Sequence, residues 1–513
     1  MSPDLLRPLA MSLAADPFLA TLALVGAVII ISALLSGLIE RSGFPQVAVL
    51  LGLGAVLGPY GLSLLNVTLD SPVLRAVSTL SLALVLFTDA LSLDLAEIRR
   101  HSRLTLLVLG PGTMLSAVLV TAAAHWLLGL SWPAAAILGA ALASTDPVLL
   151  RGLLRRPDIP STARLALRLE SGLNDAVLLP VVFVAMALLG TGHSAGVAPS
   201  WSRMGLDLFL LGPGAGVIVG FLGVSALDLV RRRLSIRRDQ ESLYSLGIAF
   251  AAYAAAESVH GSGFLAAFAA GMTISFFDVE LCDCFQEYGE TTAELALLLT
   301  FVLLGSSLIW SGLINVDGPT LLFAVIALLV RPVAFLVSLW PTKLDRESRK
   351  LIAWFGPRGL SSLLLVLLPV FAGMPGSERL FSICCLVVLL SVLLHGGSLM
   401  VLGRSKDRPA EAAAAAPPAP APAARSALPI LNPRVERAEE TPGRTPELID
   451  IPELQRLTAA GEPVVILDVR TLRSLESSDS TAEGSIRIDP ERAVSEAERL
   501  QLPREAWLVA FCA

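Results

Sequence analysis

Charged side chains are scarce in this sequence. Asp, Glu, Lys and Arg make up 16% of its 513 residues, against about 25% in soluble globular proteins. Hydrophobic residues make up 54%, and the mean hydropathy is +0.71. The shortage of charge excludes an ordinary soluble protein and places the long apolar runs before residue 403 in a lipid bilayer. With 38 Lys and Arg against 44 Asp and Glu, the chain also lacks the basic surplus of a nucleic-acid-binding protein.

Cysteine is rare as well, with five residues in the chain. Their spacing forms neither a zinc-ligand pattern nor a disulfide framework, so we expect no structural metal and no cofactor. A cleavable signal peptide is not expected either. The first apolar run, at 17–38, is long enough to span a bilayer, and no small-residue cleavage site follows it.

Apolar runs are what the sequence has in abundance, and they predict an all-α polytopic membrane protein. Several runs are shorter than the ~20 residues of a straight span, which indicates broken or tilted helices. The thirteen candidate spans lie near 17–38, 45–59, 76–94, 104–129, 133–151, 163–190, 205–230, 242–257, 262–277, 291–310, 319–340, 348–373 and 378–403.

Basic residues gather in alternate loops between these spans. By the positive-inside rule such loops are cytoplasmic. The rule predicts a cell-membrane protein with its N-terminus outside and its C-terminus in the cytoplasm. The basic loops are those with Arg99, Arg100 and Arg103; Arg151, Arg155 and Arg156; Arg231–Arg233, Arg237 and Arg238; Lys343–Lys350; and Arg404–Arg408.

The character of the chain changes after the last span. Residues 1–403 form the predicted membrane domain, and an Ala/Pro-rich and charged linker follows at 404–445. Residues 446–513 alternate a helical pattern with apolar strands at 464–467 and 507–511, which is typical of an α/β domain. This segment is too short for a complete domain of that class.

Six of the ionisable residues inside predicted spans qualify as candidates: Asp89, Asp146, Glu170, Asp175, Arg331 and Arg358. Charges are costly in lipid, so each is a candidate functional residue. Asp175 is the strongest candidate because apolar sequence continues well beyond it. Asp89 has an alternative interpretation as a residue of the wet interface, since Asp94 and Glu97 follow closely.

Two spans are interrupted, one in each half of the membrane region. Pro147 supplies no backbone N–H and disfavours α geometry at Asp146, and the run Gly356-Pro357-Arg358-Gly359 breaks a later span. Exposed backbone at membrane depth survives only inside protein or beside water. Paired breaks of this kind indicate an inverted-repeat transporter with its site between them. The alternative is a pair of structural proline kinks.

Oxygen-bearing residues near the first break suit a small hard cation. Asp175, Ser171, Thr145 and the backbone carbonyls beside Pro147 are the predicted Na⁺ ligands. Burial disfavours the ionised form of a carboxylate, so Asp175 can hold either a proton or a cation. Competition at this residue with alternating access would give Na⁺/H⁺ antiport. Glu170 and Arg331 have opposite charges on different spans, and we predict that they form an ion pair.

These motifs resemble those of the monovalent cation/proton antiporter superfamily, in its Na⁺/H⁺ exchanger branch with an Asn-Asp pair. The resemblance covers about residues 17–403. Its motifs are Phe44-Pro45 to Gly58-Pro59, Phe87–Leu91, Ser144–Pro147, Glu170–Asp175, His260–Ala266, Arg331-Pro332 and Phe355–Gly359.

The resemblance implies an antiporter fold with a six-helix core domain, a dimerisation domain and assembly as a homodimer. It implies cation and proton binding at Asp175, with Thr145, Ser171 and Asp146 at or near the ion. The family's ion pair matches Glu170 and Arg331. Asn174 replaces a second aspartate, which implies electroneutral exchange of Na⁺, or of Li⁺ or K⁺. Asp89 and Arg358 are further candidates at the site.

The tail resembles the start of a rhodanese-like domain, in Asp468-Val469-Arg470 and in the strand leading to Cys512. Rhodaneses carry a persulfide on that cysteine, held in a loop of backbone N–H groups. The chain stops one residue after Cys512, so we expect a transporter and not an enzyme. Two alternatives remain open: a membrane-anchored sulfurtransferase, and an antiporter gated by sulfur or redox chemistry at the tail.

Overall fold

The chain divides into two compact units, Met1–Ala416 and Pro417–Ala513. The computed structural model describes residues 26, 30, 46–59, 61–63, 65, 67–93, 95–154, 156, 159–191, 201–233, 238–277, 283–314, 316–342, 344–414, 454, 456–457, 463–469, 485–488, 500 and 506–511.

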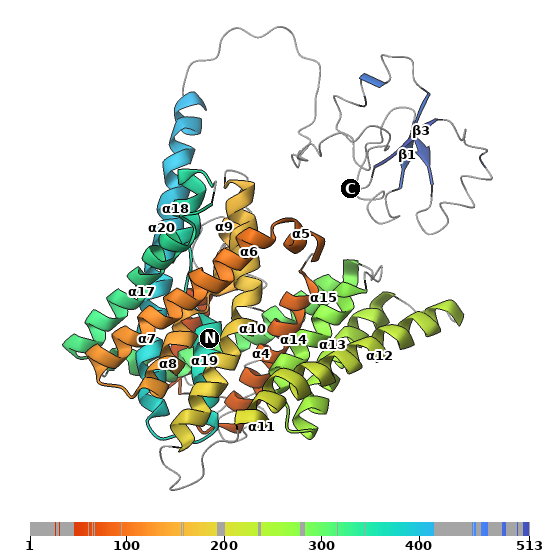
Figure 1. The fold of residues 1–513 in the computed structure, drawn as a ribbon. Helices are drawn as coiled ribbons and strands as arrows, with labels where there is room; N and C mark the ends of the chain where they lie inside the picture. The colour runs from red at the N-terminus through yellow and green to blue at the C-terminus, as the bar shows by residue number, and fades with distance from the viewer. Residues whose placement is uncertain are drawn as a thin grey trace, which may run out of the picture. The chain divides into compact units, whose positions relative to one another are not determined.

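The first unit is a bundle of helices (Figure 1). In chain order they are α3 (Gln46–Leu57), α4 (Pro72–Leu91), α5 (Leu95–Arg100), α6 (Ser102–Leu107), η1 (Val108–Thr113), α7 (Met114–Leu128), α8 (Trp132–Ala143), α9 (Pro147–Leu154), α10 (Ser161–Thr191), α11 (Trp201–Leu206), η2 (Asp207–Leu211), α12 (Gly212–Arg233), α13 (Arg238–Ser258), α14 (Gly263–Phe276), α15 (Asp283–Ser306), η3 (Leu308–Trp310), α16 (Ser311–Ile314), α17 (Gly318–Ser338), α18 (Arg346–Trp354), α19 (Leu360–Phe371) and α20 (Ser377–Ala414).

Local sequence explains where several helices begin and end. The Asp317 side chain caps α17 by accepting a hydrogen bond from the Thr320 backbone N–H at 2.8 Å, because the first N–H groups of a helix lack partners within it. Asp345 caps α18 through Ser348 in the same way. Gly129 ends α7 with φ +64, a left-handed conformation that favours glycine.

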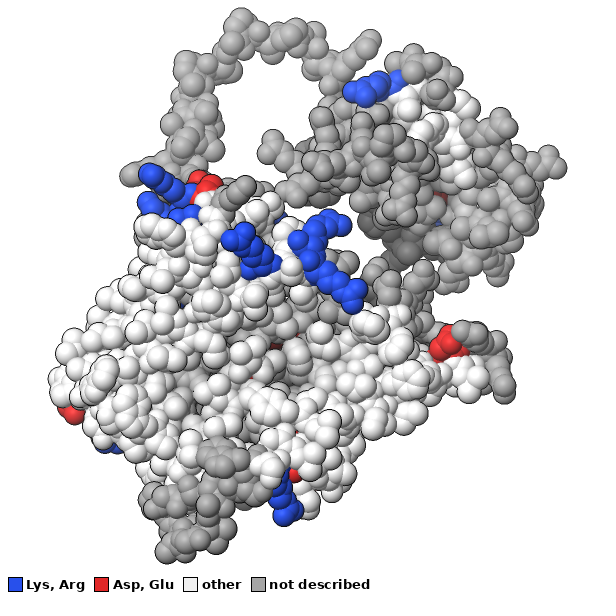
Figure 2. All heavy atoms as spheres, in the orientation of Figure 1, with Lys and Arg blue, Asp and Glu red and all other residues white. Residues whose placement is uncertain are grey.

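The surface of this unit is that of a membrane protein. Within the described ranges, six helices are long and apolar enough to cross a bilayer, or seven if the pair Thr292–Ser306 and Leu308–Ile314, bent by 57°, counts as one span. Large apolar side chains such as Trp126 and Leu393 are more than 70% exposed. On the visible face, Lys and Arg gather mainly at the end of the unit where α5, α6 and α18 lie (Figure 2). A broad uncharged surface adjoins that end.

The predicted spans differ from the observed helices in three respects. The first span, 17–38, lies almost wholly outside the described residues, and the total of thirteen stays a prediction. The span at 291–310 is bent after Ser306. The last helix, α20, continues to Ala414, past the predicted domain boundary at residue 403. Alanine has the highest helix propensity, which favours this extension into the first part of the predicted Ala/Pro-rich linker.

The second unit contains a parallel sheet of three described strands in the order β2-β1-β3. These are β1 (Val464–Asp468), β2 (Ile486–Arg487) and β3 (Trp507–Phe511). Strands therefore lie at both segments where the sequence predicts them. Most of the residues before β1 that carry the predicted helical pattern, and Cys512, lie outside the described residues. The rhodanese resemblance therefore stays a prediction.

Candidate functional site

Two interrupted helices meet at the centre of the first unit. One is interrupted between α8 and α9 at Ser144–Asp146, and the other between α18 and α19 at Phe355–Gly359. Both breaks fall where the sequence predicts them, next to Pro147 and Pro357. A proline lacks the N–H that a continuous helix needs and restricts the residue before it.

The two breaks are hydrogen-bonded to each other. The Asp146 backbone N–H donates to the Pro357 carbonyl at 2.9 Å, and the Leu360 N–H donates to Asp146 Oδ2 at 2.7 Å. Arg358 Nη1 donates to the Ser144 carbonyl at 3.0 Å. A carboxylate thus lies at the N-terminus of α19 and a guanidinium at the C-terminus of α8. Each charge has the sign that the helix dipole favours at that end.

Glycines allow this close approach of backbone to charged side chains. A Cβ on Gly359 would lie 2.0 Å from Asp146 Oδ2. A Cβ on Gly356 would lie 1.8 Å from Arg331 Nε. Both distances are far below any van der Waals contact, so the second break requires glycine at these positions.

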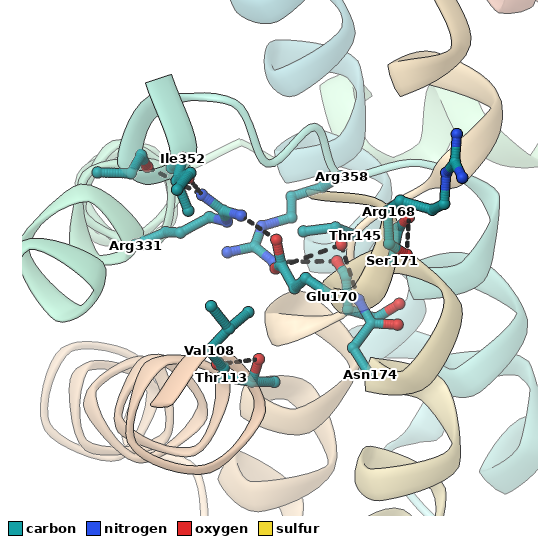
Figure 3. Close-up of polar contacts among 12 residues, drawn as sticks. Val108, Thr113, Thr145, Arg168, Glu170, Ser171, Asn174, Arg331, Ile352 and Arg358 are labelled. Carbon is teal, nitrogen blue, oxygen red and sulfur yellow. Dashed lines mark hydrogen bonds and ion pairs between the residues drawn. The ribbon is translucent and has the colours of Figure 1, made fainter. Parts of the chain in front are cut away.

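Helix α10 packs against the first break and carries a buried polar face. Glu170 and Asn174 are one helical turn apart, and both are fully buried. Arg331, on α17, forms an ion pair with Glu170 Oε2. Thr145 Oγ1 donates to Glu170 Oε1 at 3.4 Å and accepts from Asn174 Nδ2 at 2.7 Å. Figure 3 shows this chain of contacts, with Arg331 reaching across to α10.

Arg331 also closes the end of α18. Its Nη1 donates to the carbonyl of Ile352 at 2.6 Å and to that of Ala353 at 2.9 Å. These carbonyls belong to the last turn of a helix and have no partners within it. The same guanidinium therefore neutralises Glu170 and satisfies the backbone beside the second break.

Asp175 lies between the two breaks and is 2% exposed. Its Oδ1 accepts a hydrogen bond from the Ser144 hydroxyl. The Ser361 hydroxyl, in the first turn of α19, lies near enough to influence the same carboxylate. Among the described residues, Asp175 Oδ2 has no hydrogen-bond partner, and neither has Asn174 Oδ1. Two buried oxygen acceptors on neighbouring residues are thus left open for a ligand.

Two of the hydroxyls predicted beside Asp175 have other partners in the structure. The Ser171 hydroxyl donates to the Arg168 carbonyl of its own helix at 3.3 Å. Thr145 is engaged by Asn174 and Glu170, as described above. Asp89 is half-buried on α4, and Arg358 lies in the second break.

Ser144 and Ser361 were not among the predicted site residues. The available signal was modest: both are polar residues in otherwise apolar runs, next to a predicted break. Which hydroxyl faces Asp175 depends on how the two breaks cross. Helical periodicity does not give that relationship, because it describes one helix at a time.

Comparison with known proteins agrees with this architecture. The chain is 28% identical to the K(+)/H(+) antiporter NhaP of Alkalimonas amylolytica over 397 residues, which are 75% of this chain and 66% of that protein. It is 25% identical to the Na(+)/H(+) antiporter NhaG of Bacillus atrophaeus over 390 residues, 72% of each chain. The chain thus spans just under two thirds of the length of the potassium/proton antiporter.

Solved structures and a family match extend the comparison. The structure of the sodium proton antiporter MjNhaP1 from Methanocaldococcus jannaschii superposes with a TM-score of 0.62 at 20% identity, covering 74% of this chain and all of that one. This likeness shows a shared antiporter fold. Residues 28–404 match the family described as "Sodium/hydrogen exchanger, transmembrane". That match covers well over half of the sequence, and the chain therefore belongs to the sodium/hydrogen exchanger family of integral membrane proteins.

Proposed function

We propose that this protein exchanges a monovalent cation for protons across the membrane, by competition of the two at Asp175. The observation that carries the proposal is a buried carboxylate with one oxygen unpartnered, located where two helices are interrupted. Family membership supports the proposal, as do relatives named as K(+)/H(+) and Na(+)/H(+) antiporters.

The charges around the site favour a single exchangeable positive charge. Glu170 is neutralised by Arg331, and Asp146 lies at the positive end of α19 close to Arg358. Asp175 has hydroxyls near it and no ion pair among the contacts of the described residues. A buried charge without a partner is costly, so either one proton or one monovalent cation is needed to neutralise it. We therefore propose one-for-one, electroneutral exchange.

The alternation between the two occupants follows from the same chemistry. An ionised Asp175 attracts a cation that has shed part of its water, with Oδ2 as an open ligand. A protonated Asp175 is neutral and no longer binds the cation. Na⁺ is the proposed substrate, with K⁺ and Li⁺ as the other candidates.

The orientation forms part of the proposal. The basic end of the helical unit, visible in Figure 2, would face the cytoplasm by the positive-inside rule. The C-terminal end of α20 would then be cytoplasmic and the N-terminus of the chain outside. Assembly as a homodimer, which the family resemblance implies, is proposed as well.

Transport in liposomes tests the exchange directly. The full chain is purified and reconstituted with a pH-sensitive dye inside, and Na⁺, K⁺ and Li⁺ gradients are imposed in turn. The expected result is cation-driven pH change in the wild type, its loss in Asp175→Asn, and no effect of a K⁺/valinomycin-imposed membrane potential on the rate. Asp317→Asn serves as the matched control. It makes the same chemical change at the exposed N-cap of α17, outside the site described above.

Each outcome has a distinct meaning. Retained exchange in Asp175→Asn would contradict the role of this carboxylate. A response to K⁺ alone would keep the mechanism and change the substrate. A rate that follows the membrane potential would exclude electroneutral exchange.

A further inference from the structure

The hydroxyls of Ser144 and Ser361 approach Asp175 from two different interrupted helices. Ser144 is fully buried in the first break, and Ser361 is 4% exposed in the first turn after the second break. Ser144 donates to Asp175 Oδ1, and Ser361 lies near the same carboxylate. Asp175 Oδ2 is left without a described partner.

The backbone oxygen of Ser144 is already in use. It accepts one hydrogen bond from Arg358 Nη1 at 3.0 Å and another from the Ser362 hydroxyl at 3.4 Å. A carbonyl oxygen has two lone pairs, and both are occupied here. The Pro357 carbonyl likewise accepts from the Asp146 N–H. The Ser144 carbonyl is therefore a poor candidate for a cation ligand, and one lone pair of the Pro357 carbonyl is in use.

A serine hydroxyl can act on both occupants of the site. It has one proton to donate and two lone pairs to offer. While its proton points to an ionised carboxylate, its oxygen remains able to coordinate a cation. A hydrogen bond donated to the carboxylate also favours the charged form over the protonated one. Such a hydroxyl would therefore raise cation affinity and weaken proton competition at once.

We propose that Ser144 and Ser361 are ligands of the transported cation, forming with Asp175 Oδ2 an oxygen site that spans both interrupted helices. The proposal rests on the exchange function proposed above and adds ligands to it. It assigns a hydroxyl role to the two serines whose side chains lie at the Asp175 carboxylate. The chemical class of ligand is a partly dehydrated monovalent cation, for which neutral hydroxyl and single carboxylate oxygens are suitable donors.

The test compares Ser144→Ala, Ser361→Ala and the double variant in liposomes. The apparent KM and the maximal rate for Na⁺ and K⁺ are measured at an acidic and an alkaline pH. We expect the apparent KM to rise about tenfold for each single variant, the scale of one charge-assisted hydrogen bond or ligand. The rise should be larger at acidic pH, where protons compete, while the maximal rate at saturating cation changes little. Ser144→Thr and Ser361→Thr, which keep the hydroxyl, should recover much of the affinity.

Matched variants separate a ligand role from a structural one. Ser306→Ala removes a buried hydroxyl that donates within its own helix, to the Leu303 carbonyl at 2.7 Å, and should leave the KM unchanged. A second readout does not depend on transport: the shift in thermal unfolding temperature when Na⁺ or K⁺ replaces choline. Binding to the folded state stabilises it, so this shift should shrink in the alanine variants and return in the threonine variants.

Failure of the ligand proposal and failure of the exchange proposal give different experimental results. The ligand proposal would be overturned if Ser144→Ala and Ser361→Ala kept the wild-type KM and the wild-type thermal shifts. The proposed exchange would stand if Asp175→Asn were inactive in the same experiment. A KM change confined to Ser171→Ala would overturn it too, and would assign the ligand to α10. Exchange that persists in Asp175→Asn would instead overturn the proposed function.

Discussion

Asp146, in the first interrupted helix, accepts a hydrogen bond from the backbone N–H of Leu360, the first residue after the second interruption, at 2.7 Å. One carboxylate thus caps a helix that begins more than two hundred residues further along the chain. At most helices this N-terminal cap is a nearby Asp or Ser, whose side chain accepts a hydrogen bond from a first-turn N–H. At α19 the distant Asp146 has this role. It also joins the two breaks, and its loss should be measurable apart from transport.

Replacing Asp146 should therefore destabilise the protein. Asp146→Ala removes the cap, and loss of a capping side chain typically costs about 0.5–2 kcal/mol. Asp146→Asn keeps an oxygen acceptor but loses the charge, so it should retain part of that stability. Thermal unfolding of the detergent-solubilised variants measures the difference. Equal unfolding temperatures for all three proteins would show that the contact contributes nothing to α19.

The ion pair between Glu170 and Arg331 should behave as a coupled unit. Removing one member of a buried pair leaves the other uncompensated, which costs about 3–5 kcal/mol. Glu170→Gln and Arg331→Met should each lower the unfolding temperature strongly, and the double variant should lose less than the sum of the two. Part of the Arg331 effect will persist in the double variant, because its contacts with Ile352 and Ala353 are lost as well. Simple additivity would contradict the coupling.

Alanine at the glycines of the second break should disrupt the site. At Gly356 and Gly359 an added Cβ would lie within 2.0 Å of Arg331 and Asp146 side-chain atoms. Gly356→Ala and Gly359→Ala should reduce folded yield and unfolding temperature. Gly247, on α13, is the matched control, because a Cβ there meets nothing within 4 Å. Gly247→Ala should be neutral or stabilise by about 0.5–1 kcal/mol, the helix preference for alanine. Wild-type stability of the Gly356 variant would disprove the crowding.

The caps outside the membrane predict a pH dependence. Hydrogen bonds from the Thr320 hydroxyl and backbone N–H hold the pKa of Asp317 below its ordinary value. A carboxyl with a lowered pKa in the folded state contributes stability above its ordinary pKa, and that stability is lost as the pH falls through the folded value. Asp317→Asn keeps a capping oxygen that does not titrate. The stability difference between wild type and this variant should therefore be constant near neutral pH and shrink below about pH 4. A difference that grows on acidification would contradict the sign.

The positions of the breaks could be predicted because their causes are local. Pro147 and Pro357 each remove a backbone donor and restrict the preceding residue, and the structure interrupts both helices there. Helical spacing explains why Glu170 and Asn174, one turn apart, share a face of α10. Opposite buried charges suggested the pairing of Glu170 with Arg331, and the structure has that contact.

The assignment of hydroxyls around Asp175 could not be predicted in the same way. Ser171 lies one turn from Asp175 along α10, yet its hydroxyl donates to its own helix. Ser144 lies on another helix, and its contact depends on the crossing that Arg358 and Asp146 hold together. Contacts of this kind are tertiary, and each rests on a side-chain rotamer that a neighbouring helix selects. The first predicted span and Cys512 lie outside the described residues, so those predictions stay open.

The hydrogen bonds between the two breaks constrain the alternating access that the proposed exchange requires. Ser144, Asp146, Arg358 and Leu360 are tied across the crossing by contacts of 2.7 to 3.0 Å, and Arg331 ties α17 to both α10 and α18. Separating the two breaks would leave several buried polar groups without hydrogen-bond partners at once. In the proposed exchange, the less costly motion would therefore keep the crossing intact and move it as one block. The bound cation would then stay among the same protein oxygens throughout the motion. Only the side of the membrane to which the site opens would change.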